Sequence, residues 1–264
     1  MPELVDNFVK FCSIRSEHNK RRNPERILDL TDHNFFYPTT LLPTLEFRDK
    51  NSLSVLLNPR THGYVRTILY PSKWPNKTYV PFRVLRPFER SGKEKILEEI
   101  FKLMDHSYGG KMALDLLLYE FTDNIYEHSE FSRAFIMAQK YPKKEFTEIC
   151  FYDNGISIPG NFSKYGIDYT NDQDAVKKAI EGTSTKDEFA ERGWGINRLV
   201  EMFIKEANGE IFIASRNGGV YVDKNKPRLY KLGNTYKIHG TLLSLRISKS
   251  DIDIYPYIES KESG

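Results

Sequence analysis

Residues 116–128 read Leu-Leu-Leu-Tyr-Glu-Phe-Thr-Asp-Asn-Ile-Tyr-Glu-His and place polar side chains in an otherwise apolar helix. Glu120 and Asn124 are four residues apart, so a helix puts them on one face, one turn apart. A helix this apolar is expected to be buried, and a buried carboxylate needs a partner. A metal ion, a water molecule and a triphosphate would together satisfy the pair. The alternative is a helix with an exposed polar stripe, because neighbouring residues of the stretch are polar as well.

A second feature follows the strand expected at residues 148–153. Asp153 ends that strand, where its carboxylate could accept a hydrogen bond from the exocyclic amine of adenine. Gly155 would leave room for the flat base, and we include Ile158 of the same turn among the nucleotide contacts. The competing interpretation is a hairpin, since Asn-Gly is the strongest short-range hairpin signal.

A third feature is Gly193-Trp194-Gly195, which stands before a strongly amphipathic helix expected from residue 196 to 207. Glycines at a helix start present free backbone N–H groups and the positive end of the helix dipole, which is an anion site. Thr185 and Lys186 end a long polar segment, about residues 161–192, and offer a hydroxyl and an ammonium group. Long polar loops are often lids over a binding site. The alternative is a glycine-rich loop with a helix behind it and no binding role.

The last feature is Gly240-Thr241, at the start of a strand expected over residues 241–247. A threonine hydroxyl there could bind the base or a water molecule beside it. By itself the dipeptide is an ordinary strand start.

Composition excludes several classes of protein. The chain has 264 residues and a net charge of +3. This charge is too small to create an overall positive electrostatic field that would indicate nucleic acid as a partner. No apolar stretch approaches the roughly 20 residues of a membrane span, and we expect no membrane association. Cys12 and Cys150 match no metal-binding spacing, which predicts two reduced thiols and a cytoplasmic protein.

The order of expected elements predicts an α+β fold. Residues 1–90 contain a strand at 26–30, a short helix at 39–47 and a strand at 52–57, a βαβ-like unit, and residues 71–81 look like a connection. Residues 91–250 mix helices and strands without strict alternation, which favours a sheet with helices gathered on one face. Residues 251–264 are expected to be a tail.

Together these motifs resemble, in order, the four sequence boxes of the GHKL superfamily of ATP-binding domains, shared by gyrases, histidine kinases, MutL and bacterial anti-sigma kinases. The resemblance covers about residues 93–248 and is greatest to the stand-alone and anti-sigma-type ATPases. It implies a two-layer α/β sandwich with a mixed sheet of the Bergerat type, preceded by the smaller α/β unit, which faintly resembles a STAS-type domain.

The resemblance also implies roles for single residues. Asn124 would hold Mg²⁺, Glu120 would be the general base of the hydrolytic members, and Asp153 would recognise adenine, with Thr241 supporting that contact. Gly193 and Gly195 would wrap the phosphates. The chain departs from the family at Ser157, where many members have a second glycine, at the bulky Trp194, and at Asn197, which replaces a residue that is often glycine.

Three functions stay open at this point. The first is an ATP-hydrolysing regulatory switch, which Glu120 favours. The second is an anti-sigma-type kinase that phosphorylates serine or threonine on another protein, and the third is a nucleotide-binding module without turnover. Each implies ATP, Mg²⁺ and an unidentified protein partner, and a homodimer is one arrangement the chain could adopt.

Overall fold

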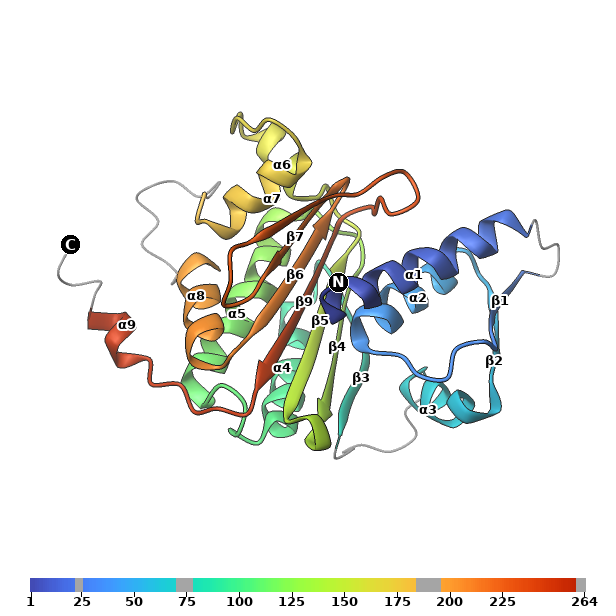
Figure 1. Cartoon of the computed structure of the whole chain (residues 1–264), viewed down its shortest axis with the longest axis horizontal. Helices are drawn as coiled ribbons and strands as arrows, with labels where there is room; N and C mark the ends of the chain where they lie inside the picture. The colour runs from blue at the N-terminus through green and yellow to red at the C-terminus, as the bar shows by residue number, and fades with distance from the viewer. Residues whose placement is uncertain (22–25, 70–77, 184–195, 260–264) are drawn as a thin grey trace.

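The computed structural model describes residues 1–21, 26–69, 78–183 and 196–259, and its centre is a seven-stranded sheet (Figure 1). The strand order is β3-β4-β5-β9-β6-β7-β8, and every neighbouring pair is antiparallel. The strands are β3 (Tyr79–Leu85), β4 (Ala134–Tyr141), β5 (Phe146–Asp153), β6 (Glu210–Ser215), β7 (Gly218–Val222), β8 (Arg228–Lys231) and β9 (Thr241–Ser248). The predicted α+β fold is confirmed. The sheet is antiparallel and not mixed, because short connections join β4 to β5, β6 to β7 and β7 to β8.

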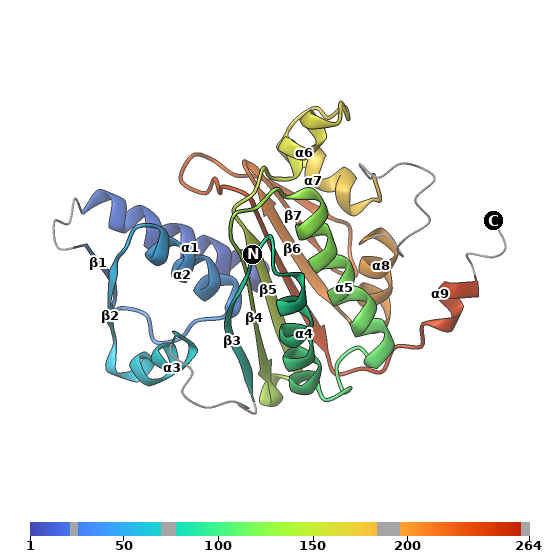
Figure 2. The same ribbon diagram turned by 180° about the vertical axis from the view of Figure 1, so that it is seen from behind.

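Helices α4 (Arg90–Met104), α5 (Lys111–His128), α7 (Asp172–Ile180) and α8 (Ile196–Glu206) cover one face of this sheet (Figure 2). The predicted apolar stripe of α8 is buried there, with Leu199, Val200 and Phe203 in the same core as Ile149 and Phe151 of β5. Helix α5 lies between α4 and α8, and α6 (Ile158–Lys164) begins shortly after β5. The long polar segment at about residues 161–192, in which we expected a short helix at 174–181, contains the end of α6 and all of α7.

The opposite face of the sheet is also covered, which corrects the expectation of helices on one face only. Helices α1 (Glu3–Lys20) and α2 (Pro38–Lys50) pack there, and Leu41 and Leu42 share a core with Cys150 and Tyr152. Successive strand residues point to opposite faces. The apolar run Ile149–Tyr152 is therefore buried from both sides, as is typical of a strand with two covered faces. Cys150 packs in the core on the α1–α2 side of the sheet.

The N-terminal βαβ unit is confirmed. Strand β1 (Ile27–Leu30) pairs in parallel with β2 (Ser54–Leu57), α2 connects them, and α3 (Pro59–Leu69) follows. The residues we assigned to a connection end in β3, which is one of the two edge strands of the main sheet. Pro81 fits in β3 because the register with β4 shifts between Val80 and Arg83, and proline is found at such irregular edge positions.

A buried ion pair joins the N-terminal helices to the sheet. Glu148 of β5 is fully buried and accepts hydrogen bonds from the Thr39 backbone N–H (2.9 Å) and hydroxyl (2.7 Å) of α2. Its other oxygen accepts from Arg246 Nε of β9 at 2.8 Å, and Arg246 also pairs with Glu3 of α1. Since an unpaired buried charge is costly, these contacts hold α1 and α2 in one position on the sheet.

Three shorter elements complete the fold, namely the 3₁₀ helix η1 (Pro142–Lys144), α6 and α9 (Tyr255–Glu259). The C-terminal segment is packed against the protein, because Ile252 and Ile254 are buried in the core beneath α8 and α5. Asn208 follows α8 in the left-handed conformation that often ends a helix, with φ of 44°. In the described part of the chain, no helix is both long and apolar enough to cross a membrane.

Candidate functional site

Three polar side chains lie side by side on β5, β9 and β6, on the face of the sheet that α4, α5, α7 and α8 cover. Asp153 ends β5 and stands opposite Thr241 of β9, which in turn stands opposite Ser215 of β6. Directly opposite residues in an antiparallel pair point to the same face. Asp153 shares its face with Phe151, which packs under α5, so all three side chains face the helices. The structure therefore brings the predicted Asp153 and Thr241 together.

Ser215 is a site residue that sequence reasoning missed. Its hydroxyl lies 3.0 Å from the Thr241 hydroxyl, donates to the Gly240 carbonyl (3.1 Å) and accepts from the Ile158 N–H (3.0 Å). Ile158, predicted as a nucleotide contact, is thereby held beside Thr241 at the start of α6. No local pattern marks Ser215, because only the β6–β9 register brings it to this position.

Two glycines let three backbone segments approach closely around Asp153. A Cβ on Gly155 would lie 1.9 Å from the Ser129 carbonyl oxygen at the end of α5, and the Ile156 N–H donates to that same oxygen at 2.7 Å. A Cβ on Gly240, where φ is +78°, would lie 1.9 Å from the Asp153 carbonyl oxygen. The glycine at position 155 is thus required by the contact between the β5 turn and α5, a reason the sequence did not reveal.

The segment after Asp153 is not a hairpin. Strand β5 is followed by α6, and the Asn154 side chain accepts hydrogen bonds from the Ser132 and Arg133 N–H groups at 3.0 and 2.9 Å. The Asn-Gly pair therefore connects the turn to the loop before β4. The hairpin interpretation of this dipeptide was wrong.

Ser157 adopts the conformation of the glycine that it replaces in the resemblance. Its φ and ψ are 75° and 162°, a region that is almost restricted to glycine. The side chain is buried, and its hydroxyl caps α6 by accepting from the Gly160 N–H at 3.3 Å. The chain thus follows a glycine-like path here despite the substitution.

The Asp153 carboxyl group is buried, and its pKa is strongly raised. Its side chain is only 4% exposed, and Oδ1 accepts one hydrogen bond, from the Gly155 N–H at 2.8 Å. Burial raises the pKa of the carboxyl from its ordinary 3.8 to about 7, and the bond from Gly155 opposes the rise only in part. Within the described ranges no cation pairs with Asp153 and no donor reaches Oδ2. The group is therefore suited to accept from a neutral N–H donor of a ligand.

Glu120 and Asn124 lie on α5 as predicted, but they are half-buried, and the helix itself satisfies part of the pair. The Asn124 amide nitrogen donates to the Glu120 backbone carbonyl (2.7 Å) and carboxylate (3.2 Å). The helix therefore satisfies part of the pair for which we expected a metal ion, a water molecule and a triphosphate. These contacts orient the Asn124 side-chain amide. Because its nitrogen is engaged within the helix, its oxygen is the atom left to bind a ligand.

The position of this pair on α5 is set by its neighbours. Asp123 faces α4, where Lys93 Nζ lies 2.6 Å from its carboxylate. Asn124 lies about 100° further round the helix from Asp123, and α8 packs on the other side of α5 from α4 (Figure 2). Along the helix axis, Asn124 is about 7.5 Å and Glu120 about 13.5 Å from Ser129, which touches the Asp153 turn.

Several predicted phosphate contacts lie outside the described residues: Thr185, Lys186, Gly193, Trp194 and Gly195. The described ends of the segment are close together, because Asn197 at the start of α8 donates to the Glu181 carbonyl at the end of α7 (3.2 Å). Helix α8 begins at Ile196, directly after the glycine pair, as the sequence predicted.

Among the residues the structure describes, no group of three or more His, Cys, Asp or Glu side chains could hold a metal ion alone. The oxygen donors at α5 are the Asn124 amide and the Glu120 carboxylate. Mg²⁺ is usually held by one or two protein oxygens together with waters and phosphates, and this donor set fits such a site.

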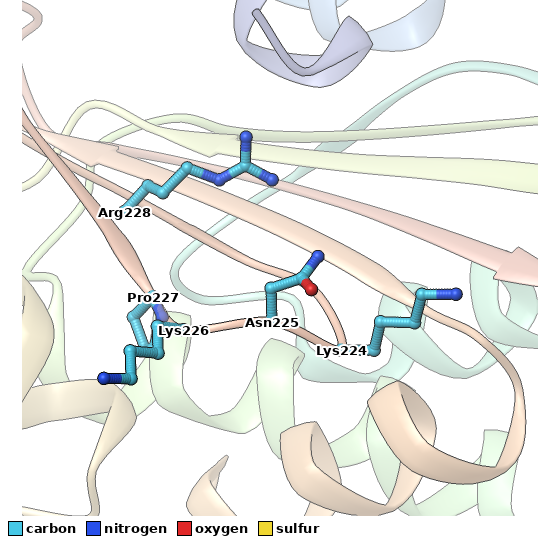
Figure 3. A pocket seen from close by; sticks show the side chains of 5 residues that line it. All are labelled: Lys224, Asn225, Lys226, Pro227 and Arg228. Carbon is cyan, nitrogen blue, oxygen red and sulfur yellow. The ribbon is translucent and has the colours of Figure 1, made fainter.

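The charged residues of the β7–β8 turn do not form a comparable site. A shallow hollow at the β7–β8 turn is lined by residues 224–228, and Figure 3 shows Lys224 and Lys226 extending in opposite directions. Arg228 pairs with Asp223 at 2.7 Å. Because these cations diverge or are already paired, the turn offers no focused anion site.

Comparison of the chain with protein-family models, curated proteins and solved structures found no match. The chemistry of the site is therefore the basis on which its function is inferred.

Proposed function

We propose that this chain is an Mg²⁺-dependent ATP-binding protein of the GHKL superfamily and acts as a regulatory switch driven by ATP hydrolysis. The observation that carries the proposal is the buried Asp153 carboxyl, which has no cationic partner in the described structure and lies beside two hydroxyl groups. A carboxyl kept only for stability is normally paired when buried. Asp153 is instead placed to bind a ligand.

Adenine fits this position by its chemistry. Its exocyclic amine is a neutral donor that can satisfy the Asp153 carboxylate, while the Thr241 and Ser215 hydroxyls can serve a ring nitrogen directly or through a water molecule. Gly155 and Gly240 let the backbone segments around Asp153 approach closely, which fixes the position of its carboxyl group. The residue types and their order agree with the resemblance noted in the sequence.

The triphosphate would extend from this position along α5. Asn124 and Glu120 lie about one and a half and two and a half helical turns from the adenine end. Asn124 would hold Mg²⁺ through its amide oxygen, and the bound ion would neutralise phosphate charge. Glu120 is within reach of the same region and would orient or deprotonate the attacking water. Its presence favours hydrolysis over passive binding.

We also propose a cytoplasmic setting with reduced thiols. Cys12 and Cys150 are both buried and unpaired with each other, and burial raises both thiol pKa values. Neither is poised for chemistry.

Incubation of the purified protein with γ-labelled ATP and Mg²⁺ tests these proposals. We expect phosphate release that is lost in Glu120→Ala and retained in Asp123→Asn, a matched control on the α4 side of the same helix. Label on an added protein partner, without free phosphate, would favour the kinase. Binding with neither would favour a module without turnover, and failure of any adenine nucleotide to bind at millimolar concentration would reject the family assignment.

A further inference from the structure

A groove opens along one edge of the small N-terminal sheet. It encloses about 770 Å³. Ser54, Val55 and Leu57 of β2 line one side, and His62 and Arg66 of α3 line the other. We call it the β2 groove. Because neighbouring strand residues point to opposite faces, the presence of both Ser54 and Val55 in its wall places the groove at the edge of the strand.

The backbone of β2 presents unpaired hydrogen-bonding groups to this groove. In a parallel pair, every second residue directs both its N–H and its C=O to the neighbouring strand. The Ser54 N–H bonds to the Arg26 carbonyl at 2.9 Å, so Ser54 and Leu56 face β1. Val55 and Leu57 therefore face the groove, and no hydrogen bond from the described residues reaches their backbone groups.

Exposed strand edges are usually protected by a lysine, a proline, a bulge or a covering segment. Strand β2 reads Ser-Val-Leu-Leu and has none of the first three, and Leu56 is 51% exposed. A two-stranded sheet is also less than is normally stable in isolation. Both facts indicate that β2 is suited to pair with a third strand.

The far wall of the groove is positively charged. His62 and Arg66 are four residues apart on α3, on one face of the helix, and both are exposed. The acidic residue of the groove, Asp49, is already paired with Arg48 and with Arg133 (3.3 Å). Arg66 has no acidic partner among the described residues, so the groove favours an anionic occupant.

We propose that the β2 groove binds an extended, acidic peptide segment of a partner protein, which adds to β2 as a third strand. The backbone groups of Val55 and Leu57 supply its main-chain hydrogen bonds, and Arg66 with His62 receives an acidic side chain. This interaction lies on the N-terminal unit and does not depend on nucleotide binding.

The test uses a defined probe without nucleotide: a labelled, end-capped peptide of sequence Thr-Val-Glu-Val-Glu-Thr, with Lys replacing Glu in a control peptide. We expect saturable binding, on the order of 100 µM for so short a contact, and binding roughly tenfold or more weaker for the lysine peptide. Amide exchange at Val55 and Leu57 should slow on binding, while that at Leu56 should change little, because its N–H already bonds to β1.

Two variants separate the contributions. Val55→Pro removes the edge N–H but leaves the β1–β2 hydrogen bonds intact, and should weaken binding about tenfold, whereas Val55→Thr keeps the N–H and should bind normally. Arg66→Glu alters an exposed residue and should weaken binding of the acidic peptide while improving that of the lysine peptide. The proposal is overturned if the acidic peptide shows no saturable binding at millimolar concentration, or if Val55→Pro and Arg66→Glu bind it as well as the unaltered protein.

Discussion

The substitution Asp153→Asn should make the protein more stable and at the same time impair nucleotide binding. The Asp153 side chain is 4% exposed, and burial raises its pKa from 3.8 to about 7. That rise corresponds to on the order of 4 kcal/mol of unfavourable free energy when the group is ionised in the folded protein. Asparagine keeps the oxygen that accepts from the Gly155 N–H and carries no charge to desolvate.

The effect should depend on pH in a defined direction. Below about pH 4 the carboxyl is protonated in both the folded and unfolded states, so it carries no desolvation penalty. Between pH 4 and 7 the unfolded chain ionises first, and the folded protein loses stability as pH rises. Above pH 7 the full penalty applies. The stability advantage of Asp153→Asn should therefore be small at pH 4, grow up to about pH 7, and then stay constant.

Denaturant unfolding at pH 5, 6, 7 and 8 measures this difference directly. Asp123→Asn is the control, because removing the partly exposed Asp123 charge from the buried Lys93 should destabilise the protein, which is the opposite sign. Isothermal titration with ATP and Mg²⁺ should show affinity for Asp153→Asn reduced roughly 10- to 150-fold, since a bond to a charged acceptor contributes about 1.5–3 kcal/mol. A variant that is less stable at pH 8, or whose advantage is the same at every pH, would refute the reasoning.

Three further predictions concern the residues around the site and the joint with the N-terminal helices. Gly155→Ala should destabilise the protein by about 2 kcal/mol or more in urea unfolding, because its Cβ would lie 1.9 Å from the Ser129 carbonyl oxygen. An unchanged urea midpoint would contradict this close approach. Ser157→Gly should be about 1–2 kcal/mol more stable than Ser157→Ala. Both variants lose the hydroxyl that caps α6, but glycine adopts the positive φ without strain whereas alanine does not. Equal stabilities would argue against backbone strain at this position. Glu148→Gln should lower the free energy of unfolding by about 3 kcal/mol, because it leaves Arg246 buried without its main counter-ion. Glu3→Gln, at a half-exposed position, should lower it by less than about 1 kcal/mol. The reverse order would contradict the assignment of the ion pair.

Much of the fold was predictable because its signals are local. The helices at 93–105, 111–128 and 196–207 and the strands at 133–139, 148–153 and 241–247 were all expected, and each expected start lies within three residues of the observed one. These segments have strong apolar periodicity, which depends only on near neighbours in the chain. Helices α1 and α3 were missed, because their apolar residues are interspersed with charges and their burial comes from distant elements.

The candidate site was predictable in part for the same reason. Asp153 and Gly155 stand at a strand end, and Glu120 and Asn124 share one helical face, so their relation can be read from spacing. The role of Gly155 in the contact with Ser129, the hydroxyl of Ser215 beside Thr241, and the glycine-like backbone of Ser157 could not. Each depends on segments that are far apart in sequence.

The amino-acid sequence by itself determined the α+β class, the order of the chemical motifs and the helix that carries Glu120 and Asn124, because periodicity and spacing act over a few residues. Only the tertiary structure decided that β9 lies between β5 and β6, which places Thr241 between Asp153 and Ser215. It also decided that the Asp153 carboxyl is buried with no cationic partner among the described residues, and that the edge of β2 opens into a groove. Burial and strand register arise from contacts across the whole chain, and no local pattern contains them.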